Sequence, residues 1–218
     1  MSILWVAVPF TLFPVAQQWI SSGLTGLVNG TMPIIATTIG AIMLHRLPGR
    51  AQAMGLMVGF VGAAAIATPS LVEGSSEALG VALVLAAVSC YGVAMNIATP
   101  LTQRYGSLPV MARMLGLAAI LTAPLGMVGF ADSSFTWGSL AAVAALGTVG
   151  TGVAFVIMGT LVSRVGSSRA SVAIYLVPVV ALVLGAVFLD ETVRVLSIVG
   201  IGLVIAGATL ASRKEPGA

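Results

Sequence analysis

Charged side chains are scarce in this sequence, where only 7% of the 218 residues are Asp, Glu, Lys or Arg. A soluble domain carries about 25% charged residues. Because 59% of the residues are hydrophobic and the mean hydropathy is +1.14, polar groups cannot cover the surface of this chain. The composition excludes an ordinary soluble domain and predicts an all-α membrane protein with almost no mass outside the bilayer.

Cysteine is almost absent, since Cys90 is the only one and lies within an apolar run. A single cysteine forms neither an internal disulfide nor a cysteine-based metal site, and we interpret Cys90 as a packing residue. The sequence also lacks a Ser/His/Asp set, a metal-ligand cluster and a phosphate-binding loop. These absences argue against an enzyme, and we expect no cofactor and no metal.

Basic residues are few and scattered, although the isoelectric point is about 9.6. The nine Lys and Arg residues stand between apolar runs and form no continuous basic patch, so nucleic acid is not an expected partner. No Lys or Arg precedes Arg46, and the N-terminus therefore lacks the charged region of a secretory signal peptide. We expect the first hydrophobic stretch to remain in the protein.

Apolar runs separated by turn signals divide the chain into about eight predicted membrane helices. Each run is close to the roughly 20 residues that cross a bilayer. The intervening loops are short, so we expect no inserted soluble domain. The predicted spans are residues 2–18, 22–44, 52–69, 78–100, 108–130, 137–161, 170–189 and 194–211.

Positive charge is concentrated on one side of this predicted bundle. Eight of the nine basic residues fall at loops or termini on the face that holds both chain ends, and only Arg194 falls on the other face. By the positive-inside rule the first face is cytoplasmic. We therefore expect a multi-pass protein of the cell inner (plasma) membrane, surrounded by membrane lipid, with both termini in the cytoplasm.

The sequence repeats itself at an offset of 145 residues. The matched pairs are Pro33 with Pro178, Gly40 with Gly185, Gly55 with Gly200, Gly62 with Gly207 and Phe10 with Phe155. Because five crossings separate equivalent spans, the two copies traverse the membrane in opposite directions. Such inverted-topology repeats are typical of secondary transporters, whose substrate site lies near the midplane between the halves. The alternative is chance matching between two membrane segments of low diversity.

The repeat also predicts how the chain is divided. Its second unit begins near Leu79, so residues 78–213 form a unit of five helices. Residues 1–70 then form an incomplete first unit of three helices. The chain thus has three and five helices in its two units, where two complete units would have five each. Residues 214–218 are left as a cytoplasmic tail.

The residues from Gly147 to Arg213 resemble the last three helices of the EamA-type permeases of the drug/metabolite transporter superfamily. The resemblance is carried by Pro178, Glu191, Gly200 and Gly207. Residues 10–69 look like helices three to five of that family, and residues 78–130 look like helices six and seven. The resemblance implies ten helices in two inverted units, of which this N-terminally short chain lacks the first two. Arg46 stands where the first unit would carry its acidic residue.

No charged residue lies at the centre of a predicted span, where it would be the default functional hypothesis. The protein would then recognise its substrate through hydroxyls, amides, aromatic rings and backbone carbonyls. Pro33 and Pro178 have no N–H to donate to the carbonyls of Asn29 and Ile174, so we expect helix kinks at a polar cavity. A kink satisfied by neighbouring helices is the alternative.

Five polar or aromatic residues at membrane depth are candidate substrate-binding residues. They are Tyr91, Asn96, Tyr175, Asn29 and Thr151. For each of them the alternative is an interhelical hydrogen bond, which contributes about 1 kcal/mol in membranes.

Together these features predict a secondary transporter or exporter of a small organic solute or metabolite, which works by alternating access. The sequence is also compatible with a homodimer. The alternative is a non-transporting membrane subunit, or a truncated paralogue, that packs with a partner.

The predicted topology can be tested by cysteine labelling of intact cells. A cysteine in place of Asp132 should react with a membrane-impermeant maleimide without permeabilisation, because the loop near residue 132 is expected outside. A cysteine placed in residues 103–109 should react only after permeabilisation. If the cysteine at position 132 also reacts only after permeabilisation, both the orientation and the eight-span count are wrong.

Overall fold

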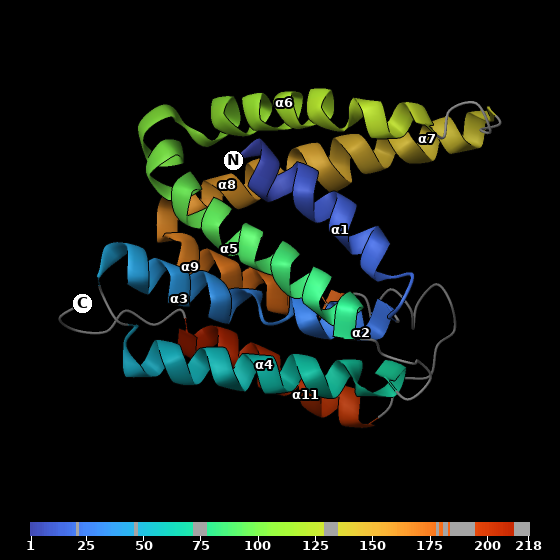
Figure 1. Ribbon diagram of the computed structural model, residues 1–218. Coiled ribbons are helices and arrows are strands. Elements are labelled where there is room, and N and C mark those ends of the chain that lie inside the picture. Colours follow the sequence, from blue (N-terminus) through green and yellow to red (C-terminus); the bar gives the residue numbers. More distant parts are fainter. Residues whose placement is uncertain are drawn as a thin grey trace.

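The computed structural model describes residues 1–20, 22–45, 48–71, 78–128, 135–177, 179–180, 183 and 195–211. Within these residues the ordered elements are all helical, which confirms the predicted all-α fold. Two segments, η1 and η2, are π-helical, and η3 is a 3-10 helix. The elements are η1 (Ile3–Ala7), α1 (Val8–Ala16), α2 (Ser22–Asn29), α3 (Met32–Leu44), α4 (Arg50–Leu71), α5 (Ala78–Tyr105), α6 (Ser107–Val128), α7 (Trp137–Ala145), η2 (Leu146–Val153), α8 (Ala154–Val165), α9 (Ser167–Ser171), η3 (Val172–Tyr175) and α11 (Val195–Ala211) (Figure 1).

Helices long and apolar enough to cross a bilayer occur in the middle of the chain. Among the described residues they are Ala78–Tyr105, Ser107–Met127 and Trp137–Val165. Shorter apolar helices cover Ile3–Ala16, Met32–Met43 and Ile198–Ala211. Parts of the prediction lie outside the described residues, namely Arg46, Pro178, Glu191, the loop near Asp132, the end of the seventh span and the tail 214–218.

The second predicted span is divided into two helices. The first of them, α2, ends at Asn29 and α3 begins at Met32, so Pro33 is the second residue of a new helix. This position suits proline because the first N–H groups of a helix have no intrahelical acceptor. The break is closed by hydrogen bonds from the Thr31 N–H to the Val28 carbonyl and from the Ile34 N–H to the Thr31 carbonyl, both 3.0 Å.

Among the described elements, helices α4 and α11 share the most extensive contact, and they lie side by side in Figure 1. Their contact is lined by glycine: a Cβ added at Gly62 would lie 2.6 Å from the Val204 N and 2.7 Å from the Gly200 O. Likewise, a Cβ at Gly55 or at Gly207 would collide with the backbone of the opposite helix. Small residues thus let the two backbones touch, as is common between membrane helices.

The direction of this pair confirms the inverted repeat for these helices. Gly55 meets Gly207 while Gly62 meets Gly200, so positions rise along α4 as they fall along α11. The two helices are therefore antiparallel. The 145-residue offset converts the first of these contacts into the second, so both halves make the same contact, as a two-fold relation requires.

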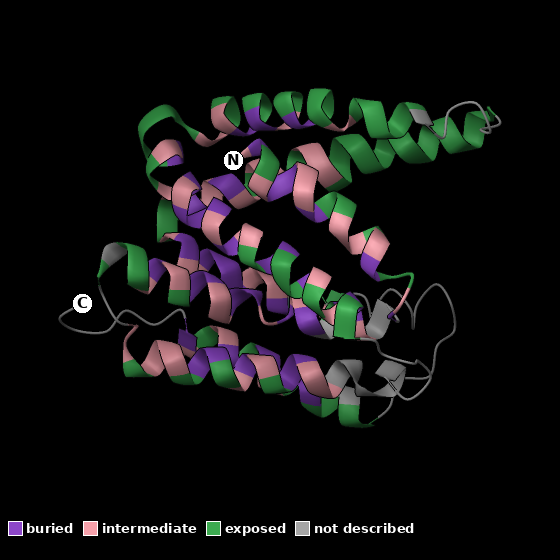
Figure 2. Ribbon diagram, in the orientation of Figure 1, coloured by how far each residue is buried: buried purple, intermediate pink, exposed green. Residues whose placement is uncertain are grey.

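Helix α5 forms the centre of the larger core. Its residues Val84, Val88 and Met95 are fully buried, and their cluster includes side chains from η1, α1, α2, α3, α6, α8 and α9. In Figure 1, α5 crosses the bundle between α6 and α7 on one side and α4 and α11 on the other. Figure 2 shows that α6 and α7 are largely exposed, and their apolar surface is suited to contact with lipid.

The glycine contact between α4 and α11 should be essential for stability. Gly207→Leu would force a side chain into the α4 backbone and should destabilise the protein by about 1–3 kcal/mol or more. The control is Gly202→Leu, because a Cβ at Gly202 would meet nothing within 4 Å. Thermal unfolding of the detergent-solubilised protein measures both variants, and equal melting temperatures would contradict the packing described for this pair.

Candidate solute-binding site

A cavity of about 270 Å³ lies between the two predicted units. Trp5, Asn29 and Met32 line it from the first unit, on η1, α2 and α3. The second unit contributes the rest from α5, α8 and η3, namely Tyr91, Met95, Ala154, Phe155, Met158 and Ile174. The volume is close to the lower end of the range for small-molecule sites.

Both repeats place an equivalent residue in this cavity. Asn29 and Ile174 are 145 residues apart, and each stands four residues before a proline of the repeat, Pro33 or Pro178. Because Pro33 has no N–H, the Asn29 carbonyl cannot accept the hydrogen bond that continues a helix. The carbonyl that Pro33 leaves without this partner thus belongs to a residue that lines the cavity.

Two of the predicted residues, Asn29 and Tyr91, have side-chain polar groups that form no hydrogen bond within the described structure. Asn29 and Tyr91 are half-buried cavity residues, and across the described part of the chain no side-chain hydrogen bond involves either of them. The Tyr91 ring stacks on Phe13, with centroids 5.9 Å apart and planes at 28°. This contact positions the ring, while the hydroxyl has no hydrogen-bond partner among the described residues.

The rest of the cavity wall is aromatic and thioether in character. Trp5 packs edge-on against Phe155, with ring centroids 5.6 Å apart. Met32, Met95 and Met158 complete the wall, and their flexible, polarizable side chains adapt to irregular apolar shapes. None of the lining residues that the structure describes is charged.

Asn96, in contrast, is part of the architecture. Its Nδ2 donates to the Ala36 carbonyl at 2.9 Å and to the Gly92 carbonyl at 2.8 Å. Its Oδ1 accepts from the Ser167 hydroxyl at 2.6 Å. These bonds join α5 to α3 and α9, and Asn96 does not line the cavity. They favour the interhelical alternative for this residue.

Tyr175 also uses its side chain to join two helical elements. The side chain is fully buried, and its hydroxyl donates to the Leu56 carbonyl on α4 at 2.7 Å. Its ring covers Gly59, where an added Cβ would lie 2.6 Å from the Tyr175 Cε2. Tyr175 thus connects η3 to α4 and sits beside the cavity residue Ile174.

The remaining predicted residues are near the cavity or outside the described part. Thr151 lies in η2, three residues before the lining residue Ala154, and does not itself line the cavity. Pro33 is fully buried next to Met32. Pro178 is not among the described residues.

Sequence reasoning missed the aromatic and methionine wall. Trp5, Met32, Met95 and Met158 had no signal that separates a cavity residue from a core residue. Phe155 had one, because it matches Phe10 in the repeat. The segment around Trp5 has another feature that only the structure reveals: η1 and residues 148–152 of η2 are both π-helical and occupy equivalent repeat positions.

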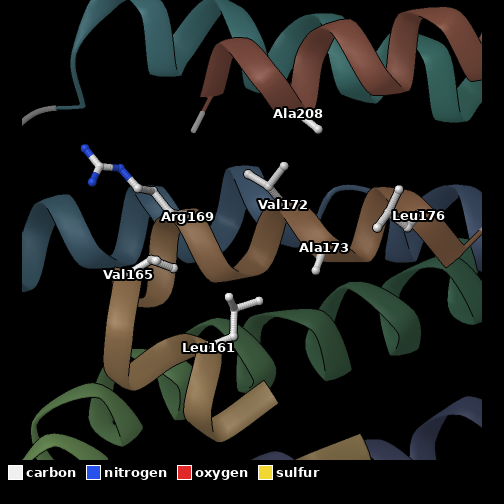
Figure 3. A pocket seen from close by; sticks show the side chains of 7 residues that line it. All are labelled: Leu161, Val165, Arg169, Val172, Ala173, Leu176 and Ala208. Atoms are coloured by element: carbon white, nitrogen blue, oxygen red, sulfur yellow. The ribbon is translucent and has the colours of Figure 1, made fainter. Parts of the chain in front are cut away.

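A second concave surface, of about 360 Å³, lies between α8, the α9–η3 segment and α11. Figure 3 shows Arg169 as the only charged side chain among the seven labelled residues, all others being apolar. None of the predicted site residues lies there. The cavity between the units is therefore the better candidate for binding a solute.

Comparison with known proteins gives a family match over the predicted second unit. The profile of the EamA-like transporter family matches residues 78–213. A solved crystal structure with 19% sequence identity superposes with a TM-score of 0.84, over 96% of this chain and 75% of that one, which shows a shared fold.

Curated relatives match from about two thirds to almost the whole of the chain. The "Probable terminal-alkyne amino-acid exporter" of Streptantibioticus cattleyicolor is 31% identical over 97% of this chain and 72% of its own length. An "Uncharacterized transporter" of Archaeoglobus fulgidus is 23% identical over 99% of this chain and 76% of its own. The "Threonine/homoserine exporter RhtA" of Salmonella typhimurium is 28% identical over 63% of this chain and 47% of its own.

Substitution of a polar residue that joins helices should affect stability more than substitution of one without a hydrogen-bond partner. Asn96→Ala would leave the Ser167 hydroxyl without its acceptor and remove the bond from α5 to the Ala36 carbonyl of α3, and should cost about 1–3 kcal/mol of stability. Tyr91→Phe removes a hydroxyl with no such partner and should leave the melting temperature in detergent nearly unchanged. An equal loss of thermal stability in both variants would contradict the conclusion that Asn96 joins helices while the Tyr91 hydroxyl has no partner.

Proposed function

Because the chain belongs to the EamA-like transporter family, we propose that it moves a small amphipathic solute of the amino-acid class across the cytoplasmic membrane by alternating access. The cavity between the antiparallel halves is the proposed binding site. Family membership confirms the predicted resemblance and the multi-pass membrane character, and it makes the chain a transporter rather than an enzyme.

The observation that carries the proposal is the shared cavity. It is lined by both units and contains equivalent positions of both repeats. It also holds the Asn29 amide and the Tyr91 hydroxyl, which have no hydrogen-bond partner in the described structure. Secondary transporters with inverted repeats bind their substrates at such an interface. A binding site between two halves can open to either side when one half rocks against the other.

The chemistry of the wall supports an amino-acid-like solute with an apolar side chain. The Asn29 amide and the Tyr91 hydroxyl can donate hydrogen bonds to a carboxylate, while the Asn29 carbonyl can accept from an ammonium group. The three methionines and the aromatic rings suit the apolar part of the solute. Two relatives whose printed names specify an amino-acid exporter agree with this class.

The proposal includes the arrangement in the membrane. We place both termini in the cytoplasm, with residues 1–70 as the first unit, residues 78–213 as the second and residues 214–218 as the tail. The charge distribution supports the orientation, and the range of the family match supports the boundaries of the second unit. Lipid surrounds the bundle, and a homodimer is compatible with this arrangement.

Transport assays test the site directly. The purified chain in liposomes should take up radiolabelled L-threonine or L-methionine, and Asn29→Ala and Tyr91→Phe should each lower kcat/KM by about tenfold. The matched control is Tyr105→Phe, because Tyr105 is exposed at the end of α5 and lies outside this cavity. Unchanged kinetics in both site variants would remove the cavity from consideration, and a wild-type chain that transports neither amino acid would favour the non-transporting alternative.

A further inference from the structure

A groove of about 370 Å³ lies where α5 ends and α6 begins. Figure 1 shows the N-terminus beside these two helices, and Met1 and Ser2 also line the groove. The groove shares no residue with the solute cavity or with the concave surface around Arg169. Its apolar wall is formed by Ile97, Leu101, Val110, Met114 and Leu117. Such a wall on two membrane helices suits contact with a lipid acyl chain.

The same groove carries positive charge. Arg113 on α6 is exposed and lines it. Tyr105, the last residue of α5, lines it as well and is 52% exposed. The Arg104 Cζ lies 5.2 Å from the centroid of the Tyr105 ring. Two arginines and an aromatic ring are thus gathered at one end of an apolar groove.

Arg113 differs in its position from the other arginines that the structure describes. It lies six residues after the first residue of α6, which corresponds to about 9 Å along the helix axis. It is the only described arginine inside a predicted span, 108–130, close to the start of that span. A charged side chain inside a span is costly unless it is paired or reaches the interface. Arg113 therefore needs an anionic partner near the membrane surface.

The described structure offers no carboxylate for this role. None of the described residues is Asp or Glu, so neither Arg104 nor Arg113 has an ion pair among them. The acids nearest to them in the sequence are Glu77, which precedes α5, and Asp132, which follows α6. Both adjoin the opposite ends of the two helices. The residues 103–109 between the helices include no acid.

We propose that this groove binds one anionic phospholipid: its phosphate pairs with Arg113, and an acyl chain lies along the apolar wall. The observation behind the proposal is charge complementarity, since a cation within a span stands beside an apolar groove and lacks a carboxylate partner in the described structure. Basic pockets between membrane helices on the cytoplasmic side are known to bind anionic headgroups. The inference does not depend on which solute is transported.

The geometry of the groove fits the two parts of such a lipid. A guanidinium group presents parallel N–H donors that match a phosphate. Tyrosine is enriched at the level of the headgroups, where Tyr105 would lie at the end of α5. The apolar residues continue from Arg113 to Met114 and Leu117, which lie further inside α6. Headgroup and acyl chain would thus meet the parts of the groove that match them.

Native mass spectrometry of the detergent-solubilised protein tests this proposal. The protein is titrated with phosphatidylglycerol or with phosphatidylcholine, which carries the same phosphate but no net charge. The wild-type chain should bind phosphatidylglycerol more tightly. Arg113→Gln should lower the affinity for phosphatidylglycerol by about fivefold, as loss of one cation near the membrane surface predicts. Its affinity for phosphatidylcholine should stay unchanged.

The matched control is Arg164→Gln, which removes the same charge from an exposed arginine in the last turn of α8, outside the groove. It should bind phosphatidylglycerol as the wild type does. Melting temperatures without added lipid verify that each variant is folded. If Arg113→Gln is not folded, Arg113→Lys takes its place and should weaken phosphatidylglycerol binding to a smaller extent, because it keeps the charge and loses the paired donors.

Three outcomes would overturn the proposal. The first is equal binding of the two lipids by the wild-type chain. The second is an equal effect of the substitutions at positions 113 and 164, which would indicate a general effect of charge. The third is full competition by sn-glycerol 3-phosphate, which has no acyl chain and would indicate a site for free phosphate groups. Solute uptake is not measured in this experiment, so failure of the proposed function remains distinguishable.

Discussion

The direct backbone contact between α4 and α11 is the constraint on which the rest of the structure depends. Membrane helices cannot rely on the hydrophobic effect to associate in lipid, so close packing between small residues must hold them together. The pair offers Tyr175 a surface at Gly59 and an acceptor at the Leu56 carbonyl. Tyr175 in turn places its neighbour Ile174 against the cavity. Glycines buried between α4 and α11 and against Tyr175 thus help to position a residue of the cavity wall.

Polar side chains within the bundle have two separate tasks. Asn96 and Tyr175 use their hydrogen bonds to join helices that are distant in the sequence, and their cost of burial is offset by complete pairing. Asn29 and Tyr91 face the cavity without such partners in the described structure. Because a buried polar group without a hydrogen bond is costly, a solute that pairs with these groups in the proposed site would gain affinity.

The sequence was sufficient for the fold but only partly for the site. Hydropathy predicted the helices, and the 145-residue repeat predicted the antiparallel relation of α4 and α11. Both signals extend over many residues. Asn29 and Tyr91, two of the candidate residues, line the cavity between the units, and their role as solute-binding residues stays a prediction. Asn96 and Tyr175 have the same residue chemistry and depth as those two, and only the three-dimensional positions of Ser167 and Leu56 distinguish their roles. The methionines of the wall had no distinguishing pattern at all.

The thioether wall has a consequence for the chemistry that the cavity tolerates. Met32 and Met95 are almost completely buried, whereas Met158 is half-buried. Oxidation of a methionine to its sulfoxide replaces a flexible apolar group with a polar one. In the proposed site, such oxidation would make part of the wall polar, so we expect it to lower the affinity for the apolar part of a solute.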